Sequence, residues 1–292
     1  MGDKKQILLV SSNRAETNLL EPLYMRLVKS PKFHVDFVGI HQHDPLYVTL
    51  KEAVALLDNL KPDLTIIPTD RLEMLPVLTA CISKRIRVAH FEAGYNFTGG
   101  TWDDAVRWAI SMWADIVFCN SRNNYERVNA VFRWLGKKAA VYHVGSTALD
   151  TPIVYGKDAI PKEPYDIVIY HPPTLHPESM DAELKEIESL LDKLTIWISP
   201  NGDEGSDYIL KRRKALAKKH KIIETTGYDK PEFLGLLSKA SRLIGNSSCL
   251  FNEAPTLGVL TIPIGIRNSQ RRKIKIWGGA SERITRILEE IL

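Results

Sequence analysis

Acidic residues follow short apolar runs in the first half of the chain. Asp70 and Glu92 come after two such runs, and Asp103 and Asp104 open an amphipathic stretch. If the runs are parallel strands, their carboxyl ends share one edge of a sheet, where these carboxylates gather. Crowded carboxylates have their protonation equilibria pushed apart, so that one can act as an acid and another as a base. The set predicts proton-transfer chemistry, with helix capping as the alternative for Asp103 and Asp104.

A turn of small residues in the second half has the composition of a phosphate site. It consists of Gly245, Asn246, Ser247 and Ser248. We expect a helix to start in residues 249–257, so that backbone N–H groups of the turn lie at the positive end of its dipole. Glu253, about a turn and a half into that helix, could bind a sugar hydroxyl of a nucleotide held there. The alternative is a Ser/Asn cap that only closes the helix.

Other polar side chains stand at the ends of predicted strands. Arg14 follows the first apolar run, where it places a fixed positive charge. His171 and Asn201 follow the first two runs of the second half. His171 precedes two prolines, so a turn residue without chemistry is the alternative for it. Together with the carboxylates, these groups favour chemistry on a nucleotide-linked substrate.

The composition limits the remaining function classes. The 292 residues are 44% hydrophobic and 25% charged, which is ordinary for a soluble protein. A net charge of +4 is too weak to argue for a nucleic-acid partner. No apolar run approaches the ~20 residues of a membrane span, and no signal peptide precedes the first strand. Three widely spaced cysteines predict reduced core thiols in a cytoplasmic protein: Cys81, Cys119 and Cys249.

One cluster has the residue types of metal ligands. It consists of His41, His43 and Asp44. The sequence places no further ligand beside it, so we predict neither a metal site nor a cofactor.

Apolar runs and amphipathic stretches alternate along the chain. The expected strands are residues 7–10, 35–39, 64–67, 88–91, 116–119 and 141–144, then residues 167–170, 195–199, 222–225, 243–245 and 261–264. The expected helices are residues 15–28, 48–60, 73–83, 103–113 and 123–135, then residues 180–191, 208–219, 231–240, 249–257 and 281–292. Runs that are apolar at both parities are typical of buried parallel strands.

A proline-bearing segment at residues 151–164 separates the two series. We therefore predict two Rossmann-like, doubly wound α/β domains, residues 1–152 and 153–292, with the last helix a candidate to pack back on the first domain. In such folds ligands bind beyond the carboxyl ends of the strands, here in the cleft between the domains.

The order of these motifs resembles the UDP-N-acetylglucosamine 2-epimerase family, whose fold is the two-domain GT-B architecture. Residues 69–75 are similar to a signature of the hydrolysing branch of that family. Further segments resemble that branch in the same order: residues 171–175, 200–206 and 245–258, followed by Arg267 and Arg271. The resemblance spans nearly the whole chain.

Other segments depart from the hydrolysing branch. Residues 90–94 resemble the non-hydrolysing branch, and residues 103–107 correspond to motifs of both. The position where the hydrolysing branch keeps an acidic residue is Tyr95 or Asn96 here. Residues 39–61 hold one helix, where family members usually carry a longer excursion. The balance of motifs favours the hydrolysing branch.

The resemblance implies an elimination in which removal of the C2 proton is coupled to departure of UDP, giving 2-acetamidoglucal. It implies acid and base roles for Asp70, Glu92 and Asp103 or Asp104, with His171 assisting the leaving oxygen. The UDP-sugar would be bound by Arg14, Asn201, Gly245, Asn246, Ser247, Ser248, Glu253, Arg267 and Arg271. We expect water to add and release N-acetylmannosamine. The alternatives are a non-hydrolysing epimerase that gives UDP-N-acetylmannosamine and a GT-B glycosyltransferase. A homodimer is a further possibility that the family suggests.

Overall fold

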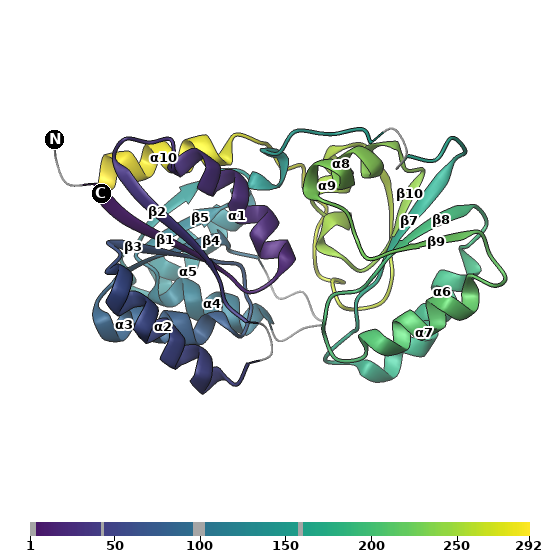
Figure 1. The fold of residues 1–292 in the computed structure, drawn as a ribbon, viewed down its shortest axis with the longest axis horizontal. Helices are drawn as coiled ribbons and strands as arrows, with labels where there is room; N and C mark the ends of the chain where they lie inside the picture. The colour runs from purple at the N-terminus through teal and green to yellow at the C-terminus, as the bar shows by residue number, and fades with distance from the viewer. Residues whose placement is uncertain (1–3, 42–43, 96–102, 157–159) are drawn as a thin grey trace. The chain divides into compact units, whose positions relative to one another are not determined.

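The computed structural model describes residues 4–41, 44–95, 103–156 and 160–292. These fall into two compact units (Figure 1). Unit 1 is drawn from Met1–Tyr95, Asp103–Asp150 and Trp277–Leu292, and unit 2 contains Thr151–Ile276. The chain therefore leaves unit 1 after Asp150 and returns to it for its last 16 residues.

Unit 1 is built on a parallel sheet that has six strands among the described residues, in the order β2-β1-β3-β4-β5-β6. The strands are β1 (Lys5–Ser11), β2 (Phe33–Gly39), β3 (Leu64–Pro68), β4 (Arg87–Ala93), β5 (Ile116–Cys119) and β6 (Ala140–His143). The helices are α1 (Arg14–Leu27), α2 (Leu46–Leu60), α3 (Met74–Lys84), α4 (Asp103–Trp113), α5 (Arg122–Leu135) and α10 (Ala280–Ile291). Helices cover both faces of the sheet (Figure 1). This is why successive residues of β1, such as Leu8 and Leu9, are both fully buried.

The C-terminal helix α10 packs against α1 in unit 1 (Figure 1). Ile284 and Leu288 of α10 join the apolar core that Leu20 and Leu23 of α1 also occupy. Asp150 accepts hydrogen bonds from backbone N–H groups at the start of α10, including that of Ser281 at 2.7 Å. A carboxylate at a helix N-terminus satisfies groups that the helix itself leaves unpaired.

Unit 2 is built on a second parallel sheet, with five strands among the described residues in the order β11-β10-β7-β8-β9. The strands are β7 (Tyr165–Ile169), β8 (Leu194–Ile198), β9 (Ile222–Thr225), β10 (Arg242–Gly245) and β11 (Leu260–Pro263). The helices are α6 (Met180–Ser189), α7 (Ser206–Leu216), α8 (Lys230–Lys239) and α9 (Glu253–Thr256). Each unit thus has the predicted doubly wound α/β architecture, and the predicted strands lie within a few residues of the observed ones.

The helix predicted in residues 249–257 is wrong. A single 3₁₀ turn, Ser248–Leu250, is followed by a break and by the four-residue helix α9. The apolar side chains of Cys249, Leu250 and Phe251 all enter one core cluster. Three consecutive inward-facing residues need a tight turn, because a regular helix would point one of them outward. Glu253 therefore opens a short helix instead of lying within a long one.

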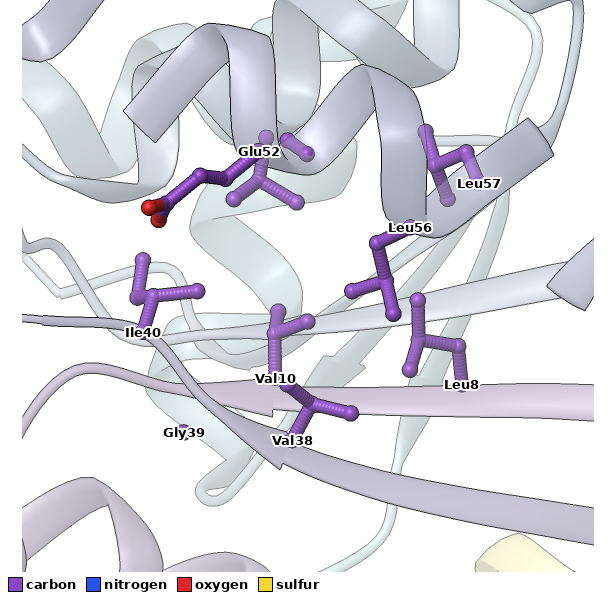
Figure 2. A pocket seen from close by; sticks show the side chains of 10 residues that line it. Leu8, Val10, Val38, Gly39, Ile40, Glu52, Leu56 and Leu57 are labelled. Carbon is purple, nitrogen blue, oxygen red and sulfur yellow. The ribbon is translucent and has the colours of Figure 1, made fainter. Parts of the chain in front are cut away.

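An apolar cavity of about 210 Å³ lies beneath α2 in unit 1. Figure 2 shows Leu56 pointing from α2 toward Val10 and Val38 on the strands, with the Glu52 carboxylate near Ile40 at the rim. Apart from Glu52, the side chains that line it are apolar. Because ligand sites use several convergent polar groups for orientation, this cavity does not have the character of the predicted active site.

Two further expectations can be compared with the structure. The three cysteines are buried and unbridged, as predicted for core thiols. Burial raises the pKa of the Cys119 thiol to about 12, so it stays protonated at neutral pH. His43, one of the three possible metal ligands, lies outside the described residues. Within the described part of the chain, every helix is too short or too polar to cross a bilayer.

Candidate functional site

The candidate carboxylates of unit 1 lie at the carboxyl ends of neighbouring strands. Asp70 follows β3, Glu92 is the penultimate residue of β4, and Asp103 and Asp104 begin α4. Strands β3 and β4 pair in parallel register from Leu64 onward. This is the arrangement that the sequence predicted, and it collects acidic groups at one edge of the sheet.

Arg107 joins two of these carboxylates. Its guanidinium is almost fully buried, forms an ion pair with Asp70, and places Nη1 2.7 Å from Oδ1 of Asp104. It also lies 5.2 Å from the centre of the Tyr95 ring, within the range of a cation–π contact. Asp104 is 2% exposed and the Asp70 side chain 17%. A buried charge is tolerated when it is paired and hydrogen-bonded, so the guanidinium makes this acidic cluster possible.

Glu92 is held by donors on two other elements. Ser146 Oγ donates to Oε1 at 2.7 Å, and Asn120 Nδ2 donates to Oε2 at 2.5 Å. Asn120 also donates to the hydroxyl of Tyr95. The Glu92 backbone has a φ of +59°, which is uncommon for a residue with a side chain. Both oxygens of this buried carboxylate therefore have a fixed orientation.

For two more predicted residues of unit 1, the structure gives the position and the exposure. Arg14 is exposed at the first position of α1, and Asp103 is partly buried at the first position of α4. Asn96 lies outside the described residues.

A buried network beside Asp70 was missed by the sequence analysis. Thr69 has a φ of +48°, and this left-handed conformation costs a residue with a Cβ roughly 1–2 kcal/mol. Its hydroxyl donates to Oε1 of Glu16 at 2.6 Å, and its carbonyl accepts from Nε2 of His90 at 2.8 Å. One sequence signal was available: Glu16 follows Asn13 at the spacing of a capping box, and Asn13 Oδ1 accepts from the Glu16 N–H at 2.9 Å.

In unit 2, Asn246 and His171 are joined by a reciprocal pair of hydrogen bonds. The His171 N–H donates to Asn246 Oδ1 at 2.7 Å, and Asn246 Nδ2 donates to the His171 carbonyl at 2.8 Å. The N–H of Asn201 donates to His171 Nδ1 at 3.0 Å. A ring nitrogen that accepts carries no proton, so the neutral imidazole bears its hydrogen on Nε2. His171 is thus a hydrogen-bond donor at that nitrogen.

Arg267 fixes the loops around His171. Its side chain is 10% exposed, donates to the Pro172 carbonyl, and places Nη2 3.1 Å from Oδ2 of Asp203. Asn201 Nδ2 donates to the same Asp203 oxygen at 2.6 Å. Oδ1 of Asn201 is buried and finds no donor among the described residues. A buried acceptor without a partner is costly, so a hydrogen-bond donor brought to this amide oxygen would be stabilising.

The small-residue turn of unit 2 begins with a glycine that the packing of the sheet requires. A Cβ on Gly245, whose φ is +133°, would lie 1.9 Å from the carbonyl oxygen of Ile169, so only glycine fits between β7 and β10. Ser247 is partly buried and Ser248 is exposed, but the helical segments that follow are too short for a substantial dipole. Any phosphate at this turn would therefore be bound by the backbone N–H groups alone, without a substantial helix dipole.

Two charged residues complete the predicted set. Glu253 is 7% exposed and forms an ion pair with Lys230, whose Nζ is 2.5 Å from Oε1. Arg271 is partly buried, and its backbone N–H donates to the Asn268 carbonyl at 3.0 Å. Lys230 is a residue that the sequence analysis did not select. Its partnership holds the Glu253 carboxylate in one position.

The family model described as UDP-N-acetylglucosamine 2-epimerase matches residues 9–292. The chain is 28% identical to the UDP-N-acetylglucosamine 2-epimerase of Neisseria meningitidis serogroup B, over 91% of this chain and 81% of that one. It is 26% identical to the GDP/UDP-N,N'-diacetylbacillosamine 2-epimerase (hydrolyzing) of Campylobacter jejuni, over 92% of this chain and 82% of that one.

The fold is also shared with solved structures. The crystal structure of UDP-GlcNAc 2-epimerase from Neisseria meningitidis bound to UDP-GlcNAc aligns with a TM-score of 0.76 at 16% identity, over 98% of this chain and 91% of that one. The two Rossmann-like units therefore have the GT-B fold that the sequence predicted. Because the family model covers almost the entire chain, the protein belongs to the UDP-N-acetylglucosamine 2-epimerase family.

Proposed function

We propose that the protein is a hydrolysing UDP-N-acetylglucosamine 2-epimerase, which converts UDP-N-acetylglucosamine and water to N-acetylmannosamine and UDP. The observation that carries the proposal is the buried cluster in which Arg107 contacts Asp70 and Asp104, with Glu92 held on the adjacent strand. Removal of a poorly acidic C–H proton needs a positioned base, and a second group must return a proton.

The elimination assigns a different role to each carboxylate. Asp70 is the more exposed partner of Arg107 and takes the C2 proton. The electrons of the C2–H bond form the C1–C2 double bond, and the C1–O bond breaks to release UDP. Glu92, oriented by Ser146 and Asn120, supplies the proton that returns to C2 on the opposite face. Asp104, which is nearly inaccessible, holds Arg107 in place, and Asp103 is the alternative acid at the start of α4.

Unit 2 binds the nucleotide in this proposal. His171 donates from Nε2 to an oxygen of the departing diphosphate, because Asn201 occupies Nδ1. The N–H groups near Ser247 and Ser248 contact phosphate oxygens, and Glu253 accepts from a ribose hydroxyl while Lys230 balances its charge. Arg14, Arg267 and Arg271 offset the charge of the diphosphate. Stabilising charge where it develops on the leaving group lowers the barrier.

The hydrolysing outcome is supported by the Campylobacter jejuni relative, whose name specifies a hydrolyzing 2-epimerase. In this outcome water adds to C1 of the 2-acetamidoglucal. The Neisseria meningitidis relative carries the name UDP-N-acetylglucosamine 2-epimerase, which leaves readdition of UDP as the second candidate.

The test is the identity of the products. The protein is incubated with UDP-N-acetylglucosamine alone and the mixture is followed by NMR. Free N-acetylmannosamine and UDP in equal amounts support the proposal. Formation of UDP-N-acetylmannosamine without free UDP overturns the hydrolysing assignment and leaves the epimerase. An unchanged donor that is consumed only after a sugar acceptor is added indicates a glycosyltransferase.

A further inference from the structure

Thr69 joins three elements of unit 1: β3, β4 and α1. It lies between β3 and Asp70, and its left-handed backbone is an outlier for a β-branched residue. Its N–H donates to the Phe91 carbonyl of β4 at 2.9 Å, in addition to its bonds with Glu16 and His90. A conformation that is intrinsically unfavourable persists only when its surroundings over-determine it. Here the surroundings supply three hydrogen bonds from two other elements.

Glu16 is the anchor of this network at the β1–α1 connection. Its side chain is almost fully buried, and Oε2 accepts from the N–H of Ser12 at 2.7 Å and from its hydroxyl at 2.9 Å. The other oxygen accepts from Thr69. Burial raises the pKa of Glu16, and the hydrogen bonds from Thr69 and Ser12 oppose that shift. A buried carboxylate with every oxygen engaged is rigid, since moving it would leave polar groups unpaired.

His90 ties the same point to α4. It is fully buried, donates from Nε2 to the Thr69 carbonyl, and has Nδ1 2.7 Å from Oγ of Ser111. Ser111 lies on the helix that carries Arg107. The network thus links Asp70 to the elements that carry the other candidate groups of unit 1: the start of α1, the end of β4 and helix α4.

We propose that Glu16 and Thr69 are positioning residues of the epimerase reaction: the Glu16 carboxylate holds Thr69 in its left-handed conformation, and this conformation aims the Asp70 carboxylate. Neither residue touches the substrate. The inference rests on the proposed function, because a positioning role has meaning only if Asp70 takes the C2 proton of the substrate. A displacement of about 1 Å at a reacting group can cost a hundredfold in rate, so a backbone rotation one residue away is enough to lower turnover by about that factor.

A matched pair of substitutions tests the conformation apart from the hydroxyl. Thr69→Val and Thr69→Gly both remove the hydrogen bond to Glu16, but only glycine adopts positive φ without strain. We expect Thr69→Gly to keep kcat within about tenfold of the wild type and Thr69→Val to lower it more than about a hundredfold, with KM and UDP affinity unchanged within a few-fold. Thr79→Val, at an exposed position of α3, is the control and should have no effect.

Two results with the Thr69 variants would overturn the inference. Equal losses in Thr69→Val and Thr69→Gly mean that the hydroxyl matters and the backbone does not. Full activity in Thr69→Val means that the position has no role. If Thr69→Val does not fold, Glu16→Gln replaces it: its kcat should fall, and adding Thr69→Gly should restore part of the loss. A double variant no better than Glu16→Gln contradicts the proposal.

Failure of this inference can be separated from failure of the proposed function. Wild-type protein that does not turn over UDP-N-acetylglucosamine refutes the proposed function by itself. The conformational claim is then read from stability, since Thr69→Gly should unfold at a higher denaturant concentration than Thr69→Val. If Thr69→Val unfolded at the higher denaturant concentration, the claim that residue 69 is held in a left-handed conformation would be refuted, whatever the reaction is.

Discussion

Nη1 of Arg107 lies 2.7 Å from Oδ1 of Asp104, and both side chains are about 2% exposed. The two residues are one turn apart on α4, so the helix itself fixes their approach. The same guanidinium pairs with Asp70 on the neighbouring connection. Asp104 therefore orients the cation that orients Asp70, and the acidic cluster of unit 1 depends on one arginine.

Replacing Arg107 should separate its structural and chemical contributions. Arg107→Ala removes the buried cation that pairs with both Asp70 and Asp104, and should lower the free energy of unfolding by about 3–5 kcal/mol. Arg107→Lys keeps the charge but loses the planar fork, so turnover should fall much more than stability. Urea unfolding and initial rates measure both.

The control is Arg122→Ala, which breaks an exposed ion pair with Glu126. It should cost less than about 1 kcal/mol and leave the rate unchanged. Full turnover in Arg107→Lys would show that the fork between Asp70 and Asp104 is not needed.

Neighbouring residues of the small-residue turn should behave differently. Asn246→Ala removes both hydrogen bonds that its side chain makes with the His171 backbone, and should destabilise unit 2 by roughly 2 kcal/mol or more. Ser248→Ala removes an exposed hydroxyl, so unfolding should change by no more than about 0.5 kcal/mol while UDP affinity falls. Denaturant unfolding and calorimetric titration with UDP distinguish the two. The reverse pattern would mean that Asn246 binds phosphate and Ser248 holds the loop.

His90 should make stability depend on pH. Burial lowers its pKa from the usual 6.5 to about 4. Between these values the unfolded state binds more protons, so stability is fully present above the unfolded pKa and is lost as the pH falls, by at most about 1.4 kcal/mol per pH unit. Glu16 has a raised pKa and acts in the opposite direction, so the comparison must be between variants.

His90→Phe should therefore lose less stability than the wild type when urea unfolding is compared at about pH 7 and about pH 5. His34→Phe, at an exposed position of β2, should behave like the wild type. Identical pH dependence in the wild type and His90→Phe would show that His90 is not buried as a neutral ring.

The carboxylates of unit 1 should govern turnover without governing nucleotide affinity. Asp70→Asn and Glu92→Gln keep the shape of each side chain but remove its basicity, and each should lower kcat by at least about a hundredfold. UDP binding should stay within a few-fold of the wild type, because the proposed function assigns neither carboxylate a contact with the nucleotide. Steady-state rates and calorimetry measure the two effects. A loss of UDP affinity as large as the loss of turnover would contradict the division of labour.

Much of the fold could be predicted because strands that are buried on both faces of a sheet have continuous apolar sequences. The prediction failed at residues 249–257, where the apolar spacing looks helical but three consecutive residues turn inward. The clustering of Asp70 and Glu92 followed from strand order. The partners of the candidate carboxylates could not be predicted. The ion pairs of Arg107 with Asp70 and of Lys230 with Glu253 are long-range contacts, which leave no local pattern in the sequence.

Backbone conformation was the second feature that the sequence did not reveal. Nothing in the residue types of Thr69 or Glu92 indicates positive φ, which both adopt in the candidate site. Strain of this kind is sustained by tertiary contacts and therefore cannot be read from local propensity. The glycine at position 245 was visible in the sequence, but its tight packing between two strands was not, because the pairing of β7 with β10 is a long-range feature.

The most direct test of the central claim is a reaction in deuterium oxide with UDP-N-acetylglucosamine as the sole substrate. Elimination by the carboxylates of unit 1 predicts UDP together with N-acetylmannosamine that carries deuterium at C2, detected by NMR and mass spectrometry. Product with hydrogen retained at C2, or a donor that stays intact, would contradict the account.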